Sequence, residues 1–279
     1  MRGTTAPDTP LPQLTVTLAL FTPRGKNVYD YRFGDPLNDT YGAGMAVDRT
    51  GNTYLAGSSY ASLDYDPSPS ITNRLPDHSN FLLKLDPAGH LQWVNSGGDF
   101  GVGDPSTYGD IAADDSGVYL TGYYDASPDF DPRQDHTAML PGSGAFLAKY
   151  SPNGTFVFAN AMLQFSAIGR KVAVDPQTAD VYVLGNFSSF VSVSDATHHI
   201  DLSVRGSGLF LARYSSTGQV LDACAVNTEY DLSYNINLAP APNGATVCTS
   251  LTSYDPADWN PGTGKLLLKD GVIVRYHAS

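Results

Sequence analysis

Glutamate is almost absent from this sequence. Of the 28 acidic residues, Glu229 is the only glutamate, and all the others are aspartate. Aspartate favours turns and caps, whereas glutamate favours helix interiors. The 27 glycines, 19 prolines and 17 tyrosines indicate the same structure, because glycine and proline mark turns and tyrosine suits a half-buried pleated surface. The sequence therefore predicts a strand-and-turn protein with little helix.

Three further shortages exclude classes of function. Only 16 lysines and arginines oppose the acidic residues, and the net charge of -12 leaves no basic stripe for a nucleic-acid backbone. No apolar run approaches the roughly 20 residues that a transmembrane helix needs. The two cysteines, Cys224 and Cys248, form at most one disulfide and cannot make a four-ligand zinc site alone. Two buried thiols are the simpler interpretation.

The strongest pattern is an internal repeat. A first block, Ala46-Val47-Asp48 followed by a turn and Tyr54-Leu55-Ala56-Gly57, returns within residues 112–122 and 173–185. A degenerate fourth copy spans residues 237–248. Repeats of this kind indicate one supersecondary unit that is stacked several times.

A second block follows each first block and contains an apolar strand, a turn with glycine and a further strand. Its copies begin at Phe81, Phe146, Phe210 and Leu266. The segment 14–25 matches this second block, but no first block precedes it. The chain therefore contains four repeats and half of another, and we expect a flexible segment over residues 1–13 and a single domain over 14–279.

Each repeat is predicted to form four short strands, because runs of apolar and β-branched residues alternate with Gly, Asn and Asp-Pro turns. Repeated four-stranded units are typical of a β-propeller. The pattern thus predicts an all-β propeller of four-stranded antiparallel blades, with five blade positions, one of them incomplete. The small residues Ala46, Ala112 and Ala173 predict that the first block forms the innermost strand, where the blades converge.

At these residues the sequence resembles the SBBP family of bacterial β-propeller repeats, over residues 14–276. The units of that family read approximately as an Ala-Val-Asp hairpin and then an Ala-Phe-Val-x-Lys-Leu-Asp hairpin. An Asp-Phe-Asp-Pro motif of one branch corresponds to Asp64-Tyr65-Asp66-Pro67 and Asp129-Phe130-Asp131-Pro132. The resemblance implies a bacterial secreted or cell-surface protein, hence an extracellular location, with an export signal outside this chain. It implies little about molecular function, which is mostly unassigned in the family.

Loop lengths indicate where a ligand would bind. In a four-stranded blade, the turns within the two hairpins lie on one face, and the other connections lie on the opposite face. The first face has only tight turns. The second has the long segments 58–80, 97–108, 123–144, 187–208 and 251–264. Long loops on a rigid scaffold concentrate binding residues, so we expect a protein or glycan ligand on this long-loop face.

The repeated Asp-x-Asp-Pro is the most distinctive chemistry of these loops. Two carboxylates two residues apart can converge on a hard cation, which makes Asp64, Asp66, Asp129 and Asp131 candidate ligands for calcium. The remaining ligands of an EF-hand loop are missing. In the alternative interpretation the aspartates cap the loop backbone, proline stiffens it, and the aromatic residue between them packs below.

Aromatic residues of the same loops could stack on sugar rings or peptide side chains, since each offers a flat apolar surface. These candidates are Tyr60, Tyr65, Tyr123, Tyr124, Tyr254 and Trp259. Packing between blades is the alternative for each of them. The domain itself is expected to be monomeric.

No catalytic motif is present: the sequence has no G-x-S-x-G, no H-E-x-x-H and no P-loop. A basic residue recurs at one position of the second block, as Lys84, Lys149, Arg213 and Lys269. This recurrence favours an architectural role, such as a pair with the aspartate that ends the first block. The sequence thus favours a noncatalytic binding module. Two alternatives remain open, namely a glycan-active hydrolase or lyase that uses aspartates at the propeller mouth, and a structural spacer in a larger surface protein.

Overall fold

The computed structural model describes residues 14–34, 37–68, 70–97, 109–125, 128–133, 135–228, 236–241, 244–249, 257–258, 267–268 and 272–277. Within them every regular element is a β-strand, and every strand pairing is antiparallel. The all-β prediction is therefore confirmed. None of these residues belongs to a helix that is long and apolar enough to cross a bilayer.

The N-terminal strands form two separate sheets. β1 (Val16–Phe21) and β2 (Asn27–Phe33) make a two-stranded hairpin. The first four-stranded unit follows with β3 (Thr40–Val47), β4 (Thr53–Ser59), β5 (Ser79–Leu85) and β6 (Leu91–Gly97), which are hydrogen-bonded in chain order. The hairpin thus corresponds to the second block without a first, as the repeat predicted.

Two further units follow the same order of strands. The second unit contains β7 (Asp110–Asp114), β8 (Gly117–Tyr124), β9 (Gly144–Tyr150) and β10 (Phe156–Leu163). The third contains β11 (Ile168–Val174), β12 (Val181–Ser194), β13 (His199–Tyr214) and β14 (Val220–Thr228). Because β10 also pairs with β12 at Met162↔Val193, the two units share one sheet.

The C-terminal strands depart from this pattern. β15 (Ile236–Ala241), β16 (Gly244–Thr249) and β19 (Val272–His277) form a three-stranded sheet, while β17 (Ala257–Asp258) and β18 (Leu267–Leu268) extend the sheet of the third unit beyond β14. β19 pairs with β16 of its own sheet, so the described strands at the two ends of the chain do not share a sheet.

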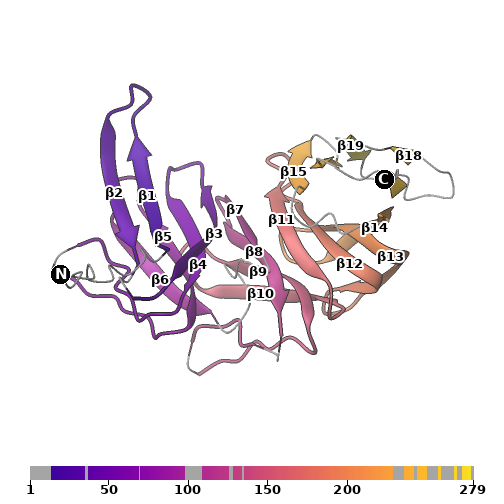
Figure 1. Cartoon of the computed structure of the whole chain (residues 1–279), viewed down its shortest axis with the longest axis horizontal. Helices are drawn as coiled ribbons and strands as arrows, with labels where there is room; N and C mark the ends of the chain where they lie inside the picture. Colours follow the sequence, from indigo (N-terminus) through magenta and orange to yellow (C-terminus); the bar gives the residue numbers. More distant parts are fainter. Residues whose placement is uncertain are drawn as a thin grey trace, which may run out of the picture.

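The first strands of successive units lie next to one another. β3 contacts β7, β7 contacts β11, and β11 contacts β15. The approach is close, because a Cβ on Gly44 would lie 3.1 Å from the backbone nitrogen of Ile111. This adjacency agrees with the predicted innermost position of the first block. Figure 1 shows the units following one another in chain order along an arc, with β1 and β2 at one end and β15 and β19 at the other.

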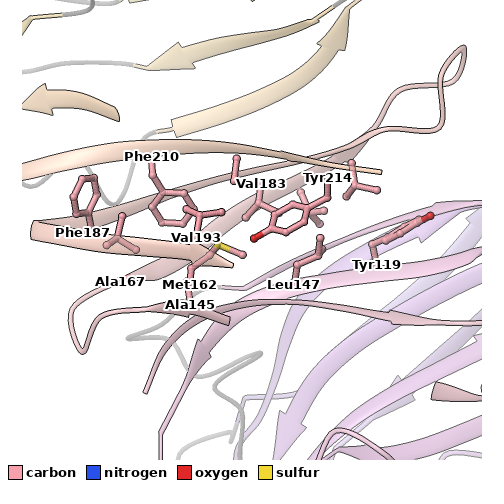
Figure 2. Packing of buried hydrophobic residues seen from close by; sticks show 14 residues of the cluster. Tyr119, Ala145, Leu147, Met162, Ala167, Val183, Phe187, Val193, Phe210 and Tyr214 are labelled. Atoms are coloured by element: carbon pink, nitrogen blue, oxygen red, sulfur yellow. The ribbon is translucent and has the colours of Figure 1, made fainter. Parts of the chain in front are cut away.

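The apolar core lies between neighbouring units. Tyr54 and Leu82 of the first unit share a cluster with Val118 and Phe146 of the second. Figure 2 shows the next such cluster, in which Tyr119 and Leu147 of the second unit face side chains of the third. β5 and β9 are buried at all seven of their positions, as expected for strands with a neighbouring sheet on each face.

The segment 187–208 of the third unit is not the long loop that the sequence predicted. β12 and β13 continue through it as a hairpin that turns back along β10. Val191 and Val193 are fully buried there, in the cluster between the second and third units. The burial of these β-branched residues explains why the segment is a strand pair and not a free loop.

Candidate functional site

The tight-turn end of each unit is fixed to its neighbour by an aromatic residue. The turn glycines of the three units have left-handed backbones, with φ of 90°, 81° and 88°. A Cβ on any of them would lie within 3.0 Å of a ring in the last strand of the hairpin or unit before it. The contacts are Tyr29 with Gly89, Trp93 with Gly154, and Phe158 with Gly218. These positions therefore require glycine for both conformation and space.

Buried lysines strengthen the same junctions. Lys84 donates to the carbonyl of Pro152 at 2.9 Å, and Lys149 donates to the carbonyl of Ser216 at 2.9 Å. Each lysine thus reaches the turn of the next unit, which confirms an architectural role. The predicted partner, the aspartate that ends the first block, is wrong. Asp48 and Asp175 accept the N–H groups of their own turns, and Arg213 forms its ion pair with Asp180. This end of the units is used for assembly, and the candidate site lies at the other end.

The Asp-x-Asp-Pro loop of the first unit is held by its own carboxylates. Asp64 Oδ1 accepts the N–H groups of Asp66 at 3.1 Å and Asn73 at 2.9 Å. Asp66 Oδ1 accepts the N–H of Ser68 at 2.8 Å, and its Oδ2 accepts the amide of Asn73 at 2.7 Å. Both aspartates therefore cap the loop backbone.

The second unit repeats this arrangement with one addition. Asp129 Oδ1 accepts the N–H groups of Asp131 at 3.0 Å and Ala138 at 2.8 Å. The guanidinium of Arg133 forms an ion pair with Asp131. These hydrogen bonds, more than the opposing effect of burial, hold the pKa of the Asp131 carboxyl below its ordinary value. The charge of Asp131 is thus already neutralised by Arg133.

The capping interpretation of Asp64, Asp66, Asp129 and Asp131 accounts for these contacts. Over the described part of the chain, no three His, Cys, Asp or Glu side chains are grouped so that they could hold a metal ion together. A calcium ion would need backbone or water oxygens in addition to a carboxylate pair. Calcium in these loops stays a prediction.

Two of the predicted aromatic residues belong to the core. Tyr65 is 1% exposed, and its ring centroid lies 4.8 Å from that of Phe81 and 5.9 Å from that of Phe33. Tyr124 is fully buried and donates its hydroxyl to the carbonyl of Pro141 at 2.7 Å. These rings fill the space between sheets and offer no face to a ligand. Tyr254 and Trp259 lie outside the described residues.

Tyr60 lies at the surface in an aromatic cluster. It is 49% exposed, with its ring centroid 6.2 Å from that of Tyr41 and 5.5 Å from that of His78, both in edge-on arrangements. The hydroxyl of Tyr41 donates to Asp39 Oδ2 at 3.0 Å. We call Asp39, Tyr41, Tyr60 and His78 the Tyr60 cluster. It combines exposed ring surface with a carboxylate and an imidazole at the long-loop end of the first unit.

Tyr123 is half-buried and forms an aromatic pair with the exposed Phe165. Its ring is perpendicular to that of Phe165, with centroids 6.4 Å apart, and Phe165 is 72% exposed. Burial, followed by the charge of Asp125, raises the pKa of the Tyr123 hydroxyl, so the residue stays neutral. Sequence reasoning missed Tyr41, His78 and Phe165. Phe165 could have been found, because it lies in the connection from β10 to β11, on the face that was expected to bind.

Asp110, the first residue of β7, has a half-buried carboxylate. Burial raises its pKa, against the opposing effect of Lys171, whose Nζ lies 3.9 Å from Oδ2. The same oxygen accepts the N–H of Val172 at 3.2 Å. These contacts join β7 to β11, and they give no support to a catalytic role.

A search among curated proteins finds no match to the chain. A family model described as SBBP, a beta-propeller repeat, matches residues 31–64. The matched segment runs from the end of β2 through the β3–β4 hairpin to Asp64. The predicted resemblance is therefore confirmed, and this segment of the chain is similar to an SBBP beta-propeller repeat.

Proposed function

We propose that the chain is a β-propeller with five blade positions, one of them incomplete, that acts as a noncatalytic binding module of a bacterial secreted or cell-surface protein. One observation carries the proposal: the tight-turn ends of the units are locked to each other, while exposed aromatic residues gather at the opposite ends. A rigid scaffold with one variable face is the usual support of a binding surface.

A glycan suits the Tyr60 cluster better than other ligands. The exposed face of Tyr60 offers the flat apolar surface on which a sugar ring stacks. The carboxylate of Asp39 and the imidazole of His78 can exchange hydrogen bonds with sugar hydroxyls at the rim of that surface. A site with an apolar platform and a few polar groups at its edge is typical of small-ligand recognition.

A glycan array with the purified chain tests this proposal. We expect binding to a restricted set of glycans, and a loss of tenfold or more in affinity for Tyr60→Ala. Val157→Ala serves as the matched control, because Val157 is also 49% exposed but lies on β10. Equal binding by the wild type and Tyr60→Ala, or no glycan bound at all, would contradict a glycan site at this cluster.

Calcium is a secondary proposal, and we assign it to the loop of the first unit. Asp66 there accepts only neutral donors among the described residues, whereas Asp131 is paired with Arg133. A cation at the first loop would therefore not compete with a charged side chain for Asp66, as it would with Arg133 for Asp131.

A further inference from the structure

The Tyr60 cluster contains a carboxylate that no basic side chain offsets. Three carboxylates of the second and third units each lie beside a base, in the pairs Asp131 with Arg133, Asp180 with Arg213 and Asp110 with Lys171. Asp39 instead accepts two neutral donors, the N–H of Leu14 at 2.9 Å and the hydroxyl of Tyr41 at 3.0 Å. Over the described residues, no lysine or arginine forms an ion pair with Asp39. Its charge is therefore available to a ligand.

The pairing of β3 with β4 brings the two tyrosines and this carboxylate to one face. The N–H of Tyr60 donates to the carbonyl of Asp39 at 3.2 Å, so these residues lie opposite each other, one position beyond the pair Thr40↔Ser59. Tyr41 is two residues after Asp39, and side chains two residues apart in a strand point to the same face. The hydrogen bond from the Tyr41 hydroxyl to Asp39 agrees with this placement. A cation on that face meets ring surface and carboxylate together.

A second carboxylate lies at the rim of the cluster. Asp77 Oδ2 is 3.6 Å from Nδ1 of His78, whose ring packs edge-on against Tyr60, and the Asp77 side chain is 71% exposed. The neighbouring base Arg74 donates to the carbonyl of Ser62 and forms no ion pair with a carboxylate of the described structure. Two acids without a paired lysine or arginine attract a cationic ligand and repel an acidic one.

We infer that the Tyr60 cluster binds sugars with a protonated amine, such as glucosamine units, in preference to neutral or acidic sugars. The inference rests on the proposed glycan-binding function and names the class of glycan. The ammonium group of the sugar lies over the exposed face of Tyr60 and donates a charge-assisted hydrogen bond to Asp39. N-acetylation of the amine removes its positive charge, and with it both attractions. The net charge of -12 adds a long-range attraction for the same ligands.

Two oligosaccharides that differ only at the amine test the inference. Chitosan oligomers are chains of glucosamine, and chitin oligomers of the same length and linkage are chains of N-acetylglucosamine. Titration calorimetry measures the affinity of the purified chain for each. We expect the glucosamine oligomer to bind about tenfold more tightly, a difference of about 1.4 kcal/mol. This preference should shrink as salt is added, because an attraction between exposed charges is screened.

The outcomes separate this inference from the function on which it rests. If the glucosamine oligomer binds no more tightly than its N-acetylated counterpart, or does not bind while other glycans on the array do, the preference for amino sugars is overturned and the glycan site remains. If no glycan on the array binds, the proposed function is overturned together with the inference.

Asp39→Asn assigns the preference to one carboxylate. Asparagine can still accept the N–H of Leu14 and bond to the hydroxyl of Tyr41, but it lacks the charge. We expect the ratio of the two affinities to fall towards one, and this ratio is the readout because a misfolded variant loses both ligands alike. Asp115→Asn is the control, since it removes the same charge from an exposed side chain in the tight turn between β7 and β8. An equal fall in both variants would overturn the assignment to Asp39.

Discussion

The tight-turn end and the long-loop end of the units have different roles. At the tight-turn end, one arrangement recurs: an aromatic ring covers a glycine of the next turn, and a lysine binds a carbonyl of that turn. At the long-loop end, the first two units share the Asp-x-Asp-Pro loop, and the third replaces it with a strand pair. Tyr65 fills the gap beside the first unit, Phe130 that beside the second, and a strand extension with Val191 that beside the third. Assembly is therefore encoded at the invariant end, and the other end can vary.

The largest effect is expected from a methyl group added at an invariant turn. Gly154→Ala combines a left-handed φ of 81° with a Cβ placed 2.8 Å from the ring of Trp93. We expect it to lower the free energy of unfolding by about 3 kcal/mol, from backbone strain and overpacking together. Gly25→Ala is the control, because Gly25 has a φ of 76° and no atom within 4 Å of an added Cβ.

Urea unfolding of the two variants measures the difference. Gly25→Ala should lower the free energy of unfolding by about 1 kcal/mol, because it adds backbone strain and no steric contact. Similar midpoints for both variants would mean that the contact between Trp93 and Gly154 contributes nothing to the junction.

The effect of calcium on stability tests the long-loop end, and we expect it to be of similar size. We expect calcium to raise the melting temperature, by the equivalent of about 2.7 kcal/mol when the free ion is a hundredfold above its dissociation constant. Asp66→Asn should remove more of this response than Asp131→Asn, because Arg133 already neutralises Asp131. Asparagine keeps much of the capping but removes the charge. Coincident melting curves in calcium and in chelator would leave the aspartates with the capping role alone.

The sequence predicted the strands and their order well, since turn residues and apolar runs are local signals. Ala46, Ala112 and Ala173 are in the first strands, and these contact each other. Contacts between repeats were not predictable in the same way. Lys149 binds a carbonyl of Ser216, which lies in the next repeat, and nothing in the local sequence of Lys149 indicates it. The burial of Tyr65 likewise depends on Phe33, in a different sheet.

The lysine junction can be tested by removing its charge. Lys149 is 6% exposed, donates to Ser216 and Ser116, and lies 4.8 Å from the ring centroid of Tyr119. We expect Lys149→Met to cost about 2 kcal/mol, since the charged donor to a half-buried carbonyl is lost while the apolar stem is kept. Lys171→Met is the control. Lys171 is partly exposed and only approaches Asp110 at 3.9 Å, so we expect a loss below about 1 kcal/mol. Equal losses of stability would show that the buried Lys149 contributes no more than the partly exposed Lys171.

The smallest effect is expected at the tip of the β12–β13 hairpin, and only in acid. Burial alone would raise the pKa of Asp195, but N–H donors from Thr197, Val220 and His198 together lower it to about 2. A carboxyl whose pKa is lower in the folded state stabilises the protein above its unfolded pKa of 3.8, and this contribution is lost as the pH falls towards 2.

The donor from Val220 belongs to β14, so the loss should free the hairpin tip from β14 before the junctions at the tight turns open. We expect the stability of the wild type to fall more steeply between about pH 4 and pH 2 than that of Asp195→Asn, when both are followed by urea unfolding. Asp115→Asn is the control, because that side chain is exposed and makes no comparable set of backbone contacts in the described structure. The same pH slope in the wild type and Asp195→Asn would show that the tip is held by the burial of Val191 and Val193 and not by the carboxylate.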